Sequence, residues 1–157
     1  MPAASDASTA KLPRTFRPLG VRLAIYVLGA MLVLVCAVIW YAFPPSIQAE
    51  FTAFQKLTVL GLGAMFYAAG YALARSRVVA RPEGITVVNG YRTRRFEWAE
   101  VLAITLKPGS PWAVLDLADG TSVPAMGIQG SDGSRAMRQV RDVRALVERF
   151  SRTEKDD

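Results

Sequence analysis

Two long apolar runs dominate the N-terminal half of the chain. Residues 23–43 form a run of 21 residues without a charge, and residues 57–74 form a second run of 18. An α-helix rises about 1.5 Å per residue, so both runs are long enough to cross the roughly 30 Å hydrocarbon core of a membrane, the second only just. Each run therefore predicts a transmembrane helix. The loop 44–56 between them begins with Pro44 and Pro45, which stop the first helix.

A cleaved signal peptide is the alternative interpretation of the first run, because it also has a basic leader and an apolar stretch. This apolar stretch is longer than that of a signal peptide, and no small-residue cleavage site follows it. Aromatic rings collect at its end, at Trp40, Tyr41 and Phe43, where membrane helices place them at the interface. A retained helix is the better interpretation.

Charge sets the expected orientation of the two helices. Residues 1–22 carry four basic residues and one acidic residue, whereas residues 44–56 carry one of each. Three more arginines follow the second run, at Arg75, Arg77 and Arg81. Because positive residues favour the cytoplasmic side, we expect a multi-pass protein of the cell membrane with both termini in the cytoplasm. Residues 1–22 begin with small polar residues and are expected to be disordered.

The second run is rich in small residues, and Ala64 and Ala68 lie four apart on one helical face. Such a pair lets two helices approach closely, which suits packing against the first helix or against a second copy in a homo-oligomer. Membrane helices are rich in glycine and alanine in general, so the spacing alone does not decide between these interpretations.

After the second run the pattern changes to short, β-branched segments separated by turn residues. Six strands are expected, at residues 78–81, 85–88, 91–98, 101–106, 112–117 and 121–125. Asp119 and Gly120 form a hairpin signal between the last two strands. Pro124 has no N–H to donate, so the last strand is expected to be an edge strand or to end there.

Asn89 and Gly90 form a second hairpin signal, typical of a type I′ turn. A strict two-residue turn at these positions would pair Val87 with Arg92 and so mix apolar and cationic side chains on one face. A one-residue slip in register exchanges the two faces of a strand. We therefore expect a longer loop or a bulge at this turn.

An amphipathic helix is expected after the strands, with a cap within residues 131–134 and an end near residue 150. Apolar residues recur at spacings of three and four along it, at Met137, Val140, Val143, Val147 and Phe150. Such a helix covers the apolar side of a small curled sheet. The residues expected in the core between them are Trp98, Val101, Leu115 and Val143. Residues 151–157 form a charged tail.

Short motifs in a fixed order carry a family resemblance. They are Pro-Glu-Gly-Ile at 82–85, Asn-Gly at 89–90, Arg-Arg at 94–95, Trp-Ala-Glu-Val at 98–101 and Asp-Gly at 119–120. In this order they resemble bacterial PH-like domains. With two preceding helices the chain is similar to actinobacterial membrane proteins of the low molecular weight protein antigen six type. The resemblance covers residues 78–150 and implies a membrane helical hairpin followed by a small, mainly β domain, a partly open antiparallel barrel capped by a C-terminal helix.

The composition argues against catalysis. The chain has no histidine, and its single cysteine, Cys36, lies within the first apolar run, where it is interpreted as a small apolar residue. The spacing of Asp116, Asp119 and Asp132 does not match a calcium loop, and two of these residues precede glycines in turns, where aspartate is common. We therefore expect no enzyme, no catalytic residues, no metal site and no cofactor.

Arginines provide the candidate binding surface. Arg92, Arg94 and Arg95 lie on one predicted strand, and Arg81 lies across the preceding turn. This set loosely resembles the basic residues of eukaryotic PH domains that bind phosphoinositides, and guanidinium groups suit phosphate through bidentate hydrogen bonds. A solvated basic face that reflects the positive-inside bias is the other interpretation.

Two hypotheses follow for the function. The first is a membrane-anchored interaction module on the cytoplasmic face, which docks an unidentified protein partner. The second is a binder of anionic lipid headgroups through the Arg-rich strand. Nucleic acid is not an expected partner, because residues 75–157 carry only 14 basic residues against 11 acidic ones.

Overall fold

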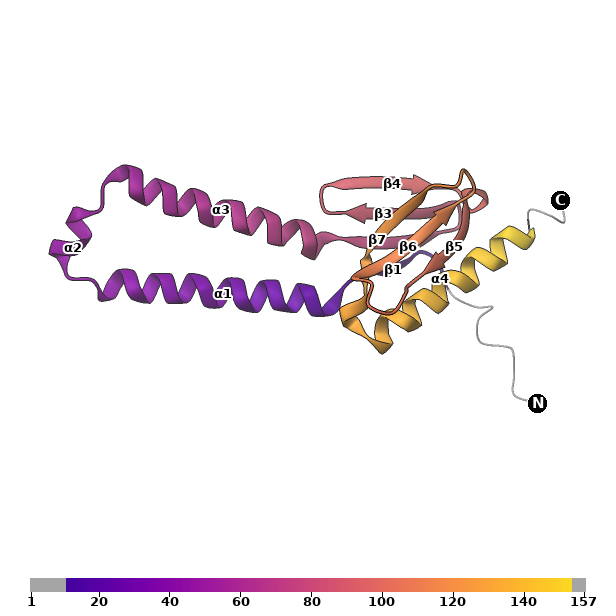
Figure 1. Cartoon of the computed structure of the whole chain (residues 1–157), viewed down its shortest axis with the longest axis horizontal. Coiled ribbons are helices and arrows are strands. Elements are labelled where there is room, and N and C mark those ends of the chain that lie inside the picture. The colour runs from indigo at the N-terminus through magenta and orange to yellow at the C-terminus, as the bar shows by residue number, and fades with distance from the viewer. Residues whose placement is uncertain (1–10, 154–157) are drawn as a thin grey trace.

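The computed structural model describes residues 11–153, and Figure 1 shows a helical hairpin that projects from a mainly β domain. The first three helices are α1 (Leu19–Ala42), the short α2 (Pro45–Glu50) and α3 (Ala53–Arg75). The strands are β1 (Arg14–Phe16), β2 (Arg77–Arg81), β3 (Gly84–Asn89), β4 (Arg92–Phe96), β5 (Val101–Thr105), β6 (Trp112–Leu117) and β7 (Ser122–Gln129). The chain then forms the helix α4 (Ser134–Thr153).

The two hairpin helices are long and almost fully exposed. Both are long and apolar enough to cross a membrane, and each begins four residues before the predicted runs 23–43 and 57–74. The structure describes both helices in full: α1 buries no side chain, and α3 buries only Ala74. They approach each other near the domain, where Gly70 faces Ile25. Their apolar side chains therefore lack a partner among the described residues over most of the length of the helices.

The described strands form two antiparallel sheets, in the orders β1-β2-β3-β4 and β5-β6-β7. The sheets stay open, so the domain is PH-like without a closed barrel. The side chain of Asn89 joins the sheets, since its amide donates to the Pro124 carbonyl at 2.5 Å and its Oδ1 accepts from the Met126 N–H at 3.0 Å. A Cβ on Gly127 would lie 2.5 Å from the Arg77 backbone, so glycine lets β7 approach β2 this closely.

The β3–β4 hairpin lacks the longer loop or bulge expected from the sequence. Its turn has two central residues, Gly90 and Tyr91, and the ladder on both sides is regular. Gly90 has φ 59° whereas Tyr91 does not have a positive φ, which indicates a type II′ turn in place of type I′. This register moves the partner of Val87 from Arg92 to Arg94. The apolar and cationic pairing therefore remains, and it is tolerated because β4 is an edge strand with exposed arginines.

Pro124 lies inside a strand that is longer than predicted. β7 is the outer strand of its sheet, as expected, but it continues past the predicted end at Ala125 to Gln129. A proline without an N–H is compatible with the outer edge of a sheet. Here the Pro124 carbonyl accepts its hydrogen bond from Asn89 of the other sheet.

The N-terminal segment 1–22 differs from the disordered stretch predicted for it, as far as the structure describes it. Residues 14–16 form β1, which pairs with β2 through Arg14–Ala80 and Phe16–Val78. The Phe16 side chain is only 4% exposed and belongs to the domain core. Burial of the Phe16 side chain in the core stabilises this short strand. A strand of three residues is too short to give a recognisable hydrophobic pattern in the sequence. Residues 1–10 lie outside the described residues.

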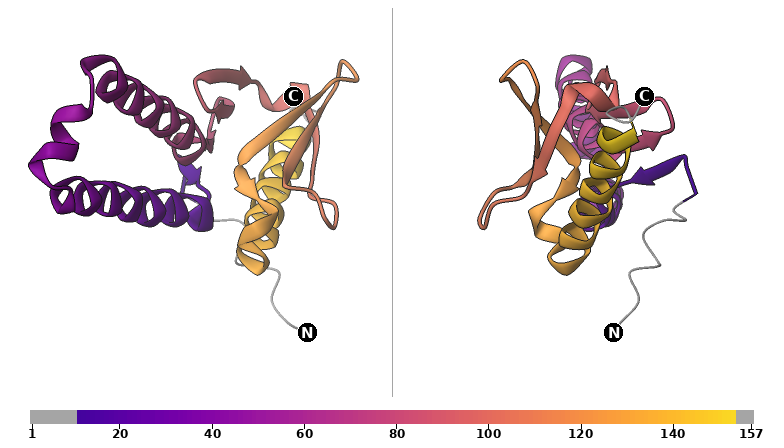
Figure 2. Two further views of the ribbon diagram at one scale, coloured as in Figure 1. Left: turned by 60° about the vertical axis from the view of Figure 1, so that its left-hand side comes forward. Right: turned by 90° about the vertical axis from the view of Figure 1, so that its right-hand side faces the viewer.

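The helix α4 covers one face of the β5-β6-β7 sheet, as Figure 2 shows. The predicted core is confirmed: Trp98, Val101, Leu115 and Val143 are all buried in one cluster. The predicted apolar stripe of α4 is wrong at Met137, whose side chain is 46% exposed. Ala136 and Leu146, which were not predicted, are buried.

The predicted tail 151–157 is also corrected in part. Residues 151–153 continue α4. Residues 154–157 lie outside the described part of the chain.

Candidate functional site

The β3–β4 turn is attached to the end of α3. The Gly90 N–H donates to the Ser76 hydroxyl at 3.0 Å, and that buried hydroxyl donates to the Ala72 carbonyl at 3.1 Å. Beyond it, the Tyr91 hydroxyl donates to the Ala68 carbonyl at 2.8 Å. We call this contact the turn–helix junction. It fixes the start of β4 beside the last two turns of α3.

Arg75, the last residue of α3, lies between two aromatic rings at this junction. Its guanidinium carbon is 5.7 Å from the ring centre of Tyr71 and 5.3 Å from that of Tyr91. The ring of Tyr71 in turn stacks on that of Tyr67. Cation–π contacts of this kind hold a guanidinium in place while its N–H groups stay free for other acceptors. In the sequence Arg75 was informative only for topology, because Tyr91 follows it by 16 positions and only the fold brings the two residues together.

The structure divides the four predicted site arginines between two faces of the sheet. Successive residues of a strand point to opposite faces, so Arg92 and Arg94 lie on one face and Arg95 on the other. The register places Arg81 on the same face as Arg95, and at the opposite end of the ladder from Arg92. All four side chains are exposed. The structure therefore brings together Arg92 and Arg94, and separates the other two from them.

The N-terminus of α1 is attached to the same domain. The carboxylate of Asp132 accepts the N–H groups of Leu19 and Gly20, both at 2.8 Å, as an anion does at a helix N-terminus. Just before this helix, Arg14 of β1 forms an ion pair of 2.9 Å with Asp142 of α4. Both ends of the hairpin are thus attached to one domain.

A second set of arginines was missed by the sequence analysis. Arg135, Arg138 and Arg141 recur every three residues along α4, and Arg14 faces them from β1. The three-residue spacing was a readable signal for a basic helical side. Arg14, in contrast, belonged to a segment predicted to be disordered, so its position beside α4 was not foreseeable.

The small-residue face of α3 is exposed in the single chain. Ala64 and Ala68 are both exposed, and the small residue that meets α1 is Gly70. The predicted packing of this alanine pair against the first helix is therefore not found, and contact with a second copy stays a prediction.

The described residues contain no group of three His, Cys, Asp or Glu side chains that could hold a metal ion. Asp119 instead has a structural role: hydrogen bonds from the backbone N–H and the hydroxyl of Thr121 lower the pKa of its carboxyl group. The carboxylate thereby stabilises the turn between β6 and β7.

Comparison with known proteins agrees with this geometry. A family model described as a bacterial PH domain matches residues 75–146. Uncharacterized proteins of Mycobacterium tuberculosis and Mycobacterium bovis are 33% identical to the chain over 100 residues. The alignments cover 64% of this chain and 65% of each relative, so they span a little under two thirds of those proteins. No solved structure matches the chain significantly. The segment from β2 through most of α4 therefore matches the bacterial PH domain family.

Proposed function

We propose that the chain is a membrane-anchored interaction module, in which α1 and α3 cross the membrane as a hairpin and hold the PH domain against the cytoplasmic face. The observation that carries this proposal is the attachment of both helix ends to one domain. β1 precedes α1 and pairs with β2, which follows α3. Both helices therefore leave the domain on the same side, as a two-span hairpin requires, and α2 forms the far end (Figure 1).

The exposure of the helices also supports membrane insertion. Large apolar side chains such as Leu34 and Leu60 are 63% and 69% exposed along the hairpin. Soluble monomers rarely expose contiguous apolar patches larger than a few hundred Å². Lipid would cover this surface along nearly the whole length of both helices.

The structure also bears on the signal-peptide alternative. Cleavage after α1 would release β1, and with it the buried ring of Phe16 and the ion pair from Arg14 to Asp142. A retained helix keeps all of these contacts. This supports an anchor over a leader.

Cysteine accessibility tests the proposed topology. In a Cys36→Ala background, single cysteines at the exposed positions Ser46 and Ser131 report the α2 side and the domain side. An impermeant maleimide on intact cells is expected to label Ser46→Cys and to label Ser131→Cys only after permeabilisation. The reverse pattern would contradict the proposed orientation.

Docking of a protein partner is the role that we favour for the tethered domain. The match to bacterial PH domains and the resemblance to PH-like domains, which mostly bind proteins or lipid headgroups, support a binding role. The edge strand β4 presents an exposed polar surface next to the membrane anchor.

Binding of anionic lipid by β4 is a second candidate function, favoured by the turn–helix junction. The Gly90 N–H bonds to Ser76, so the turn lies beside the last turn of α3. Because the Tyr91 hydroxyl reaches the Ala68 carbonyl, the tip of that side chain lies about 10 Å back along α3 from Arg75, at 1.5 Å per residue. If α3 enters the membrane beyond Arg75, Arg92 lies at the level of the headgroups. Arg94 and Arg95 lie farther from the bilayer, by about 3.3 Å for each residue along the strand.

Association with anionic vesicles tests this second function. The intact protein in phosphatidylcholine nanodiscs is mixed with anionic vesicles, and the Arg92→Gln, Arg94→Gln, Arg95→Gln triple variant is compared with the wild type. Lower vesicle association of the variant at low salt, and little difference at high salt, is expected for a headgroup contact, since screening weakens exposed charges. The single variant Arg92→Gln should have a larger effect than Arg95→Gln. Equal association of wild type and triple variant at low salt would leave protein docking as the function of β4.

A further inference from the structure

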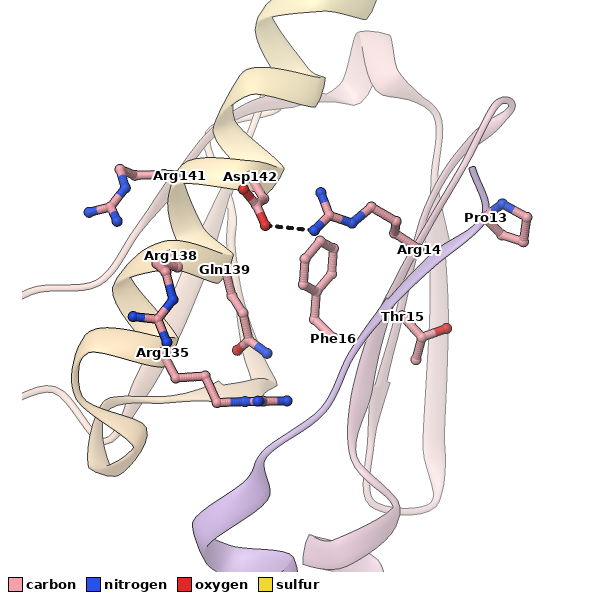
Figure 3. Close-up of a pocket in the computed structure, with 9 residues that line it drawn as sticks. All are labelled: Pro13, Arg14, Thr15, Phe16, Arg135, Arg138, Gln139, Arg141 and Asp142. Carbon is pink, nitrogen blue, oxygen red and sulfur yellow. Dashed lines mark hydrogen bonds and ion pairs between the residues drawn. The ribbon is translucent and has the colours of Figure 1, made fainter. Parts of the chain in front are cut away.

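A polar groove separates β1 from the N-terminal half of α4. It has a volume of about 730 Å³ and is open to solvent on one side. Figure 3 shows Arg14 and Phe16 on the β1 wall, with Gln139 and Asp142 on the α4 wall and Arg135 extending across the lower end. We call it the basic groove. It is separate from β4, which lies on the other edge of the sheet that begins with β1.

The basic groove has an excess of positive charge that the described residues do not neutralise. Four arginines line it, and its one acidic residue, Asp142, is paired with Arg14. Arg138 donates one hydrogen bond to the Ser134 hydroxyl at 3.3 Å. Arg135 is exposed at the lower end of the groove and has no hydrogen bond or ion pair with any residue that the structure describes. A bound anion would supply the missing counter-charge.

Gln139 provides a second and independent observation. Its side chain is 8% exposed and lines the groove, and its Oε1 atom has no hydrogen-bond partner among residues 11–153. Buried polar atoms without a partner lower stability, so native proteins keep few of them. An apolar residue at this position would pack on α4 without that cost. The buried Oε1 therefore points to a hydrogen-bond donor that the described residues do not supply, and a ligand in the groove provides one when the amide turns toward it.

We propose that the basic groove binds a phosphomonoester that carries a neighbouring hydroxyl group. The phosphate would accept hydrogen bonds from the guanidinium of Arg135, with Arg14 and Arg138 adding charge from both walls. Arginine suits phosphate because its planar fork donates two parallel bonds. The hydroxyl would donate to Gln139 Oε1. A dianionic phosphomonoester compensates this charge better than a carboxylate or a phosphodiester, each of which carries a single charge.

Two sources can supply this chemistry. Asp132, two residues before α4, caps the N-terminus of α1, so the groove lies close to the point where α1 leaves the domain. A lipid phosphomonoester headgroup could reach it from the membrane surface. A soluble polyol phosphate could enter from the aqueous side. The binding chemistry is the same for both, and the experiment separates them.

The test uses the full chain in phosphatidylcholine nanodiscs and measures binding of glycerol 3-phosphate by calorimetry. A second arm compares nanodiscs that contain 1-acyl lysophosphatidic acid, a lipid phosphomonoester with a free hydroxyl on the neighbouring carbon, with nanodiscs that contain phosphatidylglycerol, a phosphodiester. The variants are Arg135→Gln and Gln139→Leu. Lys107→Gln is the matched control, because it removes the same charge from an exposed position between β5 and β6, outside the groove and outside β4.

The expected result is saturable binding that weakens about tenfold or more in Arg135→Gln and is unchanged in Lys107→Gln. Gln139→Leu should weaken binding as well, yet raise the thermal midpoint of the protein without ligand, since it removes the unpartnered amide. This opposite change in affinity and stability separates a ligand-binding role of Gln139 from a purely structural one. Folding of both groove variants is checked by their thermal midpoints before binding is measured.

Several outcomes would overturn the proposal. Absence of binding to both glycerol 3-phosphate and lysophosphatidic acid would refute it, as would equal weakening by Arg135→Gln and Lys107→Gln. Equal response to lysophosphatidic acid and phosphatidylglycerol, without glycerol 3-phosphate binding, would indicate attraction by charge alone and also overturn it. Preference for lysophosphatidic acid alone assigns the lipid as the source, and binding of glycerol 3-phosphate assigns a soluble ligand.

Discussion

Replacing Trp98 by alanine should destabilise the domain more than a change at either of the other two tryptophans. Trp98 follows β4, is 5% exposed, and belongs to the core cluster. Its ring stacks on Phe150 of α4, with centroids 5.0 Å apart and planes 8° from parallel. Its Nε1–H lies within hydrogen-bonding distance of two carbonyls, of Arg81 at 3.0 Å and Pro82 at 3.1 Å. The residue therefore joins sheet, turn and helix.

The size of the effect follows from these contacts. Truncating a buried tryptophan to alanine costs about 3–5 kcal/mol, which includes the cavity it leaves. Stacked aromatic pairs contribute about 0.5–1.5 kcal/mol beyond the buried area, so part of this loss is shared with Phe150. A domain of this size has a total stability of about 5–15 kcal/mol, and each kcal/mol shifts its midpoint by about 4–8 °C. We expect Trp98→Ala to lower the thermal midpoint by more than about 10 °C.

Thermal unfolding of the full chain in detergent, followed by near-ultraviolet circular dichroism, measures this shift. Trp112→Ala is the matched control: Trp112 begins β6, is only partly buried, and lies outside the core cluster. It should cost about 1 kcal/mol, the value of a partly buried apolar contact. A double-mutant cycle with Phe150→Leu should return a coupling energy of about 0.5–1.5 kcal/mol. Equal shifts for Trp98→Ala and Trp112→Ala would refute the proposed organisation of the core.

Two further predictions concern the close approach of the sheets and the last hairpin. Gly127→Ala should destabilise the domain by about 1–3 kcal/mol, because the added Cβ would overlap the Arg77 backbone. Gly63→Ala is the control and should be tolerated, because this position on α3 lies in open space. Equal thermal midpoints for the two variants would contradict the close approach of β7 and β2. The hydrogen bonds from Thr121 lower the pKa of Asp119, so the stability they provide should be present above about pH 4, the ordinary range of an aspartate, and lost as the pH falls through the lowered value. The stability difference between wild type and Asp119→Asn, followed by unfolding at several pH values, should therefore be constant near neutrality and disappear in acid; a difference that grows in acid would be the wrong sign.

The sequence predicted those parts of the fold that local patterns determine. Both apolar helices, the six strands after α3 and the helix α4 are found close to their predicted positions, because each has its own periodicity or length signal. The buried set with Trp98 and Val143 followed from the same patterns. The short motifs resembled bacterial PH-like domains, and a bacterial PH domain model matches residues 75–146.

Features that depend on contacts between distant residues were not predictable in this way. Asn89 and Gly90 were correctly seen as a turn signal, but Asn89 bonds to β7 and Gly90 bonds to the end of α3. These distant partners move the turn by one position and change its type. The four candidate arginines were treated as one cluster because they are close in the sequence. Successive residues of a strand point to opposite faces of the sheet, so closeness in sequence does not place their side chains together. The basic groove was missed because its two walls are far apart in the sequence: β1 precedes the helical hairpin, whereas α4 follows it.

The position of β1 links the assembly of the domain to the insertion of the helices. This strand is synthesised before α1, but β2, its partner, is synthesised only after α3. On the proposed topology, the ribosome must complete both spans, and both ends must stay on one side of the bilayer, before Phe16 can enter the core. A chain with one helix inserted in the wrong direction would leave the domain without its edge strand. The folded domain would then act as a check on its own biogenesis, since only correctly inserted chains gain its full stability and escape quality-control proteolysis.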